Sequence, residues 1–336
     1  MFGNLVNRHD FVRLAEKLAA DGIEPLVARF VRSRGARVRA AWADGTDATS
    51  QWWMIAAVHR RWATMVCGQP DIDFPEWLRR RHLAGRTDLV GLSVGCGTGY
   101  RVARWAALGI FRRIDAFDLS PARIAAARAE VERQGVGDRV ALRVGDMATV
   151  ALPDAGYDVV LGEQALHHFT GLENTFARLA RTLRPDGILY VDEFVGPTRH
   201  QWTARQLAAA NDLLQQLPEA YRRMLDGRVK RIVMRPSILR MLITDPSEAV
   251  ESGRLQAALR EHFEVIEQHG YGGAVLEPLL CGIAHHFCGD GPETRSLLER
   301  CFAAEDELLA TGAVEHDFVV AVARPLRHGR TPAVLT

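Results

Sequence analysis

The chain has 336 residues, of which 48% are hydrophobic, and a formal net charge of +1. This composition predicts a globular protein with a sizeable core, built as one large domain or one domain with an appendage. The balanced charge argues against a general basic field that would attract nucleic acid. Five cysteines without CxxC spacing argue against a disulfide framework or a zinc knuckle and favour a reducing compartment.

Neither the first ten residues nor any later window has the apolar character of a signal peptide or a membrane span. We therefore expect a cytoplasmic protein whose partner is a small-molecule substrate rather than nucleic acid or a membrane. A homo-oligomer is compatible with the sequence.

Residues 1–85 predict a helical N-terminal extension, because apolar residues recur at roughly helical spacing from Phe11 to Phe30. A second helix is expected from Ser50 to Cys67, with Gly68 as its stop, and a third begins at Pro75. Tryptophans 52, 53, 62 and 77 gather in this region. They are interpreted as core aromatics that join the extension to the rest of the fold, or alternatively as a roof over a ligand.

From about residue 86 the pattern changes to short apolar runs that alternate with helices. Strands are predicted over 88–94, 113–117, 140–144, 157–161 and 188–191, and helices over 100–108, 121–134 and 173–183. Such alternation indicates parallel βαβ units in a doubly wound sheet.

Residues 201–261 predict a helical insertion, after which the alternating pattern returns over 262–325 with strands near 263–268 and 317–323 and a helix over 293–309. Residues 326–336 are predicted to be a poorly anchored tail. Together with 86–200, the segment 262–325 is assigned to the core.

A glycine-rich turn follows the first predicted core strand, in Val90-Gly-Leu-Ser-Val-Gly-Cys-Gly-Thr-Gly99. Glycines there allow tight turning and close approach of a ligand to the backbone. Asp118 ends the next strand, where a doubly wound fold places a carboxylate that accepts hydrogen bonds from ribose hydroxyls. The glycines are spaced GxGxG rather than GxGxxG, which argues against a dinucleotide.

The stretch from Leu92 to Ala126, with its glycine turn and Ala-Phe-Asp-Leu-Ser-Pro, resembles class I S-adenosylmethionine-dependent methyltransferases. The similarity continues through Val144-Gly-Asp-Met147, Tyr157 to His168 and Leu183-Arg-Pro-Asp-Gly-Ile-Leu189, and the final strands extend it to about residue 325. The resemblance implies an α/β fold of the Rossmann-like type, with a seven-stranded, mostly parallel sheet and helices on both faces.

The resemblance also implies the cofactor S-adenosyl-L-methionine and the residues that hold it. The glycine turn should pass beneath the amino-acid part, Asp118 should bind the ribose, and Asp146 with Met147 should flank adenine. The predicted cofactor-binding residues are Gly95, Cys96, Gly97, Gly99, Asp118, Leu119, Asp146, Met147, Glu163 and Gln164. An acid at Glu163 departs from the family, and it could face the cofactor's ammonium, its sulfonium or the substrate.

Methyl transfer is an in-line displacement that needs an aligned nucleophile, and a hydroxyl nucleophile usually needs a base. His167, His168 and Glu193 are the predicted catalytic residues, because they follow the fourth and fifth core strands at the rim where the methyl group should lie. The alternatives are helix-start packing or capping for the histidines, and a salt bridge from Glu193 to Arg199 or another surface arginine.

His285 and His286 could in principle form a metal site with His167, His168 and Glu193. Adjacent histidines usually point in different directions, and methyl transfer needs no metal. We therefore predict no metal site from the sequence.

The resemblance predicts a methyltransferase that modifies an oxygen or nitrogen nucleophile of a small metabolite in specialised (natural-product) biosynthesis, with the helical extension and insertion capping the site. Three alternatives stay open, because a fold alone does not fix function. They are a protein or peptide methyltransferase, an enzyme that uses the bound cofactor for cyclisation or decarboxylation, and a non-catalytic binding module.

Overall fold

The computed structural model describes residues 50–326. A seven-stranded sheet runs through it in the order β3-β2-β1-β4-β5-β7-β6. The strands are β1 (Leu89–Val94), β2 (Phe111–Asp118), β3 (Val140–Val144), β4 (Tyr157–Glu163), β5 (Leu183–Phe194), β6 (Phe263–Gly270) and β7 (Phe318–Pro325). The first five pair in parallel, and β7 is antiparallel to both of its neighbours, which confirms the predicted Rossmann-like, mostly parallel sheet.

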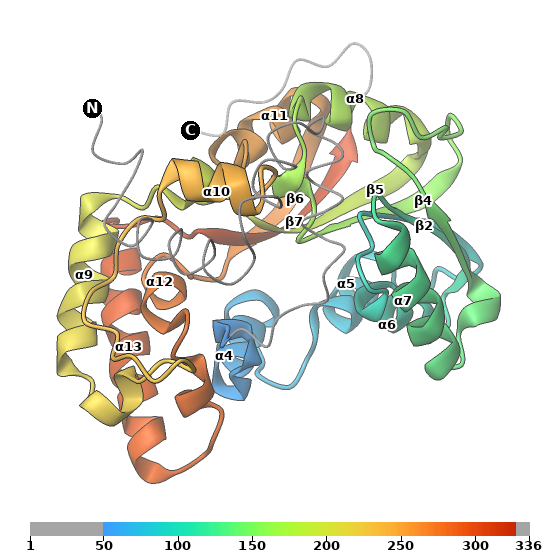
Figure 1. Ribbon diagram of the computed structural model, residues 1–336. Helices are drawn as coiled ribbons and strands as arrows, with labels where there is room; N and C mark the ends of the chain where they lie inside the picture. The colour runs from blue at the N-terminus through green and yellow to red at the C-terminus, as the bar shows by residue number, and fades with distance from the viewer. Residues whose placement is uncertain (1–49, 327–336) are drawn as a thin grey trace.

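Both faces of the sheet are buried, and alternate residues of each central strand serve different faces. Val159 and Leu161 of β4 belong to one apolar cluster, whereas Val160 between them belongs to the other. The first face is covered by α4 (Ala56–Cys67), α5 (Phe74–His82), α6 (Tyr100–Ala107) and α7 (Pro121–Arg133). The second is covered by α8 (Leu172–Thr182) and α11 (Leu255–His262), which pack side by side (Figure 1).

The insertion after β5 begins with α9 (Ala204–Gln216), and it also holds α10 (Ile238–Thr244) and α11. The predicted helical character is therefore confirmed in part, because no helix forms between Arg223 and Ser237. Two helices between β6 and β7, α12 (Leu276–Leu280) and α13 (Pro292–Ala310), gather with α9 and α4 beside the sheet (Figure 1). The segment between β6 and β7 thus adds to the helical layer as well as to the core.

The helix ends follow the signals in the sequence. Gly68 adopts a left-handed conformation with φ of 74° and donates its N–H to the Thr64 carbonyl, which ends α4. Asp73 caps α5 by accepting a hydrogen bond from the Glu76 amide, with Pro75 in the first turn. Thr203 and Gln206 form a reciprocal capping box at the start of α9.

The tryptophans before β1 divide between core and surface. Trp52 is fully buried and packs edge-on against Trp62 and obliquely against Phe318 of β7, so it does join this region to the sheet. Trp53 is 50% exposed, and its prediction as a core residue is wrong. The helices predicted before residue 50 and the tail after 326 lie outside the described residues.

Candidate active site

The glycine turn joins β1 to α6 at the carboxyl edge of the sheet. Gly95, Gly97 and Gly99 all have positive φ, at 65°, 56° and 86°. A Cβ on Gly99 would lie 2.8 Å from the Cα of Ala127, and a Cβ on Gly95 would lie 2.7 Å from the Cβ of Ala165. Glycine is required at these points because any side chain would strain the backbone and push neighbouring elements apart.

Asp118 at the end of β2 reaches across to this turn. Its Oδ2 accepts the Gly97 N–H at 3.0 Å, and its Oδ1 accepts the Ser120 N–H at 2.8 Å. A carboxylate can accept about four hydrogen bonds, so each oxygen retains capacity for a hydroxyl group. The donor set therefore fits the ribose of an adenosyl ligand above a bare peptide turn.

The other predicted cofactor residues surround the same edge. Asp146 is exposed after β3, and its Oδ1 accepts the Ala148 N–H at 2.8 Å. Met147 next to it is buried, and Leu119 is half-buried beyond β2. The Cys96 N–H bonds to the Phe117 carbonyl, and burial raises the pKa of the Cys96 thiol to about 12. Cys96 therefore stays a neutral thiol that shapes the turn.

Glu163 ends β4 among charged neighbours. Its Oε2 accepts the Trp105 indole N–H at 2.8 Å, and the Arg101 guanidinium donates to its carbonyl at 3.3 Å. Burial raises the pKa of Glu163 to about 7; Arg101 and Arg104 oppose the rise and Asp192 adds to it. This carboxyl can gain or lose a proton near neutral pH.

Gln164 is a non-glycine residue with a left-handed φ of 52°, a conformation that costs energy and is common at functional sites. Hydrogen bonds to Asp192 of β5 hold it there: its N–H donates to the Asp192 carbonyl at 2.8 Å and its side-chain amide to Oδ1 at 3.1 Å. Tyr271 donates its hydroxyl to the same Oδ1 at 2.5 Å. The chain is therefore turned sharply at this point, just before the two histidines.

Glu193 is completely buried beside the turn that follows β4. Its Oε1 accepts the N–H groups of Ala165 and Leu166, each at 2.6 Å, and its Oε2 lies 2.6 Å from Nδ1 of His167. Arg199 donates to carbonyls of the insertion. Since its side chain has no exposed surface, Glu193 is a positioning residue for His167 rather than a substrate contact.

The pKa of the two adjacent histidines is shifted in opposite directions. Burial disfavours charge on His167, but the charge and hydrogen bond of Glu193 outweigh it and raise the pKa of His167 to about 9. Burial, reinforced by the charge on His167, lowers the pKa of His168 to about 3. At neutral pH His167 therefore carries a positive charge and His168 is neutral.

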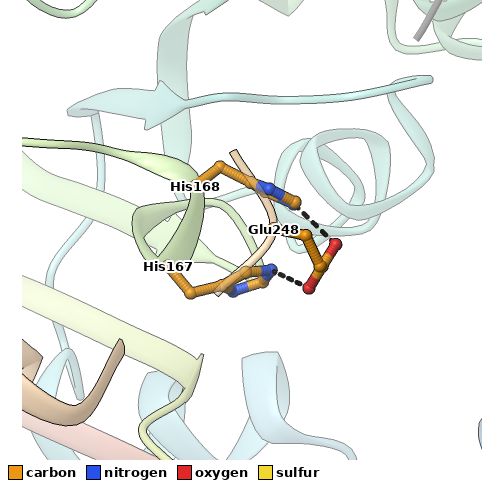
Figure 2. Close-up of side chains that lie close together, drawn as sticks. All are labelled: His167, His168 and Glu248. Carbon is orange, nitrogen blue, oxygen red and sulfur yellow. Dashed lines mark ion pairs between the residues drawn. The ribbon is translucent and has the colours of Figure 1, made fainter. Parts of the chain in front are cut away.

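The insertion supplies residues that the sequence reasoning missed. Figure 2 shows Glu248 between the two histidines: its carboxylate oxygens lie 3.8 Å from Nε2 of His167 and 3.9 Å from Nε2 of His168. His200, immediately before the insertion, approaches the same carboxylate at 3.1 Å. The insertion has no periodicity or motif that marks Glu248, because the contact depends on how the loop folds back.

His285 and His286 lie elsewhere. Nδ1 of His285 bonds to Ser50 at 2.7 Å, and Nε2 of His286 lies 2.7 Å from the Arg223 carbonyl. The grouping of these two residues with His167, His168 and Glu193 is therefore wrong, and both stabilise contacts of the helical layer.

Comparison with known proteins finds related sequences for the part of the chain that contains β1 to β5. Residues 92–191 match the methyltransferase domain family. Over 104 residues the chain is 30% identical to the 27-O-demethylrifamycin SV methyltransferase of Amycolatopsis mediterranei, which covers 31% of this chain and 38% of that protein. It is 34% identical over 98 residues to the malonyl-[acyl-carrier protein] O-methyltransferase of Serratia marcescens. This match covers 29% of this chain and 35% of that protein. The nocamycin O-methyltransferase of Saccharothrix syringae is 36% identical over 97 residues, with 29% and 34% covered.

Two solved structures align with most of this chain at low sequence identity. An S-adenosylmethionine-dependent methyltransferase from Mesorhizobium loti aligns with a TM-score of 0.43 and 18% identity, covering 74% of this chain and 97% of that one. The [4+2]-cyclase SpnF aligns with a TM-score of 0.44 and 16% identity, covering 90% and 92%.

Residues 92–191 are thus a class I S-adenosylmethionine-dependent methyltransferase domain, and its cofactor is S-adenosyl-L-methionine. The chain spans little more than a third of the length of the three curated relatives. Within residues 50–326, no helix combines the length and apolar character needed to cross a bilayer.

Proposed function

We propose that the protein transfers a methyl group from S-adenosylmethionine to an oxygen or nitrogen nucleophile of a small metabolite in specialised biosynthesis. The names of the rifamycin and nocamycin relatives support the substrate class. The helical layer and the insertion beside the carboxyl edge support it too, because such caps shape closed pockets for small molecules.

The observation that carries the proposal is the His167–Glu193 pair next to the glycine turn. Ala165, two residues before His167, lies within van der Waals reach of Gly95, so the histidine and the turn belong to one crevice. The buried Glu193 carboxylate binds Nδ1 of the His167 imidazole, so that Nε2 points toward Glu248. This arrangement of a carboxylate that orients an imidazole is suited to accepting a proton from a hydroxyl.

The residues of the chain divide the work. Asp118 and the glycine turn would hold the adenosyl ligand, and Glu163 would face its charged amino-acid end. Because the pKa of His167 is raised to about 9, its neutral form would accept the proton of the nucleophile, and this form becomes more populated as pH rises toward that value. Glu193 would fix the orientation of the ring while the insertion excludes water. When bound, the cofactor supplies an electrophilic methyl group on a sulfonium.

The test combines binding with turnover. We expect calorimetry to show one S-adenosylmethionine site per chain, and a panel of hydroxylated and aminated metabolites to yield a methylated product together with an equal amount of S-adenosylhomocysteine. Conversion of a substrate without cofactor consumption would contradict methyl transfer, as would cofactor binding with no product across small molecules but methylation of a peptide.

A further inference from the structure

We propose that His167, His168 and Glu248 form a binding site for a divalent first-row transition metal ion. One ligand atom from each of the three residues lies within 4.8 Å of the other two (Figure 2). The histidines come from the turn after β4 and the carboxylate from the insertion, so the site joins two parts of the chain. Two imidazoles and one carboxylate are a donor set that binds zinc or iron(II).

Each of these three side chains has the outer partner that a metal ligand needs. Nδ1 of His167 is held by Glu193 at 2.6 Å, which leaves Nε2 to coordinate. Nδ1 of His168 lies 3.3 Å from the Ser247 hydroxyl, and Glu248 is held by His200 at 3.1 Å. Carboxylate–histidine–metal arrays of this kind orient ligands and raise their basicity.

The distances between the proposed ligand atoms are slightly longer than in a metal-bound site. Ligand bonds of about 2.0–2.2 Å in a tetrahedral site separate neighbouring donor atoms by about 3.3 Å. The Glu248 oxygens lie 3.8 and 3.9 Å from Nε2 of His167 and of His168, so each of these separations has to shorten by about half an ångström. The loop is already tied to the histidines, because the Val250 N–H donates to the His167 carbonyl at 3.1 Å.

Polar atoms around the cluster point independently to a cationic ligand. Among the described residues, Oε2 of Glu277 is buried without a hydrogen-bond partner. Glu277 is close enough to interact electrostatically with His200, Glu248 and His167. With Glu193 and Glu248, it gives the cluster three carboxyl groups, which favours a divalent cation.

Three protein ligands leave at least one coordination position for a substrate, as in catalytic metal sites. The next step rests on the proposed function. The open position would hold an oxygen nucleophile of the substrate, since a metal lowers the pKa of a bound hydroxyl. The hydroxyl proton would pass to water, the oxygen would form the new bond to the methyl carbon, and the carbon–sulfur bond would break with its electron pair left on sulfur. When the metal is bound, Nε2 of His167 coordinates it and cannot accept a proton. The metal ion then activates the hydroxyl in place of His167.

Titration with cobalt(II) tests the site without turnover. The full chain is stripped with a chelator, desalted and titrated with Co²⁺, while visible absorption and calorimetry are recorded. We expect one ion per chain with a dissociation constant in the micromolar range or tighter. Glu248→Gln and His168→Ala should each weaken binding by at least about 100-fold, and Glu193→Gln by about 10- to 100-fold, the range found for outer-shell partners.

The matched control is His286→Ala, in the other pair of adjacent histidines, whose rings lie 3.9 Å apart. This variant should bind Co²⁺ as the unaltered chain does. Glu248→Gln keeps the size of the side chain and serves as the decisive variant if His168→Ala fails to fold. Absence of Co²⁺ binding, or binding that Glu248→Gln leaves unchanged, overturns the metal site. Methyl transfer that persists in such a metal-free protein would still support the proposed function.

Discussion

Replacing Glu193 by glutamine tests how the buried carboxylate acts through His167. Glu193 accepts three hydrogen bonds, two from backbone N–H groups and one from His167. In the variant, the amide oxygen can keep the two backbone bonds, but its NH₂ group must then face Nδ1 of His167. Loss of the Glu193 charge removes a main cause of the raised pKa of His167. In the neutral form that acts as a base, the imidazole would then have to accept at Nδ1, which places its proton on Nε2 and leaves no lone pair there for the proton of the nucleophile.

The structure predicts a large catalytic loss with a small loss of stability. General-base catalysis contributes about 10²- to 10⁴-fold, so kcat should fall by about that factor while affinity for S-adenosylmethionine stays unchanged. Exchange of one charge-assisted hydrogen bond for a neutral contact should reduce the free energy of unfolding by about 1–2 kcal/mol. Steady-state kinetics, cofactor calorimetry and chemical denaturation measure the three quantities.

Glu305→Gln provides a control of the same chemistry. Glu305 is also fully buried and also accepts two consecutive backbone N–H groups, from Val275 and Leu276. It should lose stability while kcat stays within about threefold of the unaltered chain, because it contacts no residue of the crevice. A kcat for Glu193→Gln within about threefold of normal would refute the orienting role.

Three further outcomes are expected. Asp118→Ala should weaken S-adenosylmethionine binding at least about tenfold in calorimetry, because a charged acceptor is lost from the ribose position, and equal affinity would remove Asp118 from the site. Since the pKa of Glu163 is raised to about 7 by burial and only its ionised form attracts the cofactor's ammonium group, affinity should rise by up to about tenfold from pH 6 to pH 8, and Glu163→Gln should abolish that rise. Trp52→Ala should lower the free energy of unfolding by about 3–5 kcal/mol in denaturant titrations, because this side chain is fully buried against Trp62 and Phe318; a change below about 1 kcal/mol would contradict that packing.

The core strands and their order of appearance were predictable because apolar runs and turn residues are local signals. The strand over 140–144 agrees to the residue, and Pro121 marks the start of α7. β5 is longer than its predicted apolar run, since its first residues, which include Pro185 and Asp186, lack strand character. Leu183 pairs with Tyr157 and the register then jumps to Ile188 opposite Val159, so the residues between them form an irregularity that no apolar run could predict.

The glycine turn and the position of Asp118 beside it were similarly predictable, because these residues lie at fixed offsets from strands. The residues that lie opposite the two histidines, Glu248 and His200, could not be predicted from the sequence. Glu248 and His200 approach His167 only after the insertion folds back over the edge, and no spacing in the sequence records that approach. Glu193 was found by its place at the end of β5, but its role as the partner of His167 depends on burial that the sequence does not display.

A crystal structure with S-adenosylhomocysteine would show whether this edge of the sheet holds the cofactor with its reactive end toward the histidines. We expect ribose hydroxyls within hydrogen-bond distance of the Asp118 carboxylate and a sulfur atom directed at His167 and Glu248. A nucleoside bound away from the Gly95–Gly99 turn, or a sulfur atom directed away from His167, would contradict it.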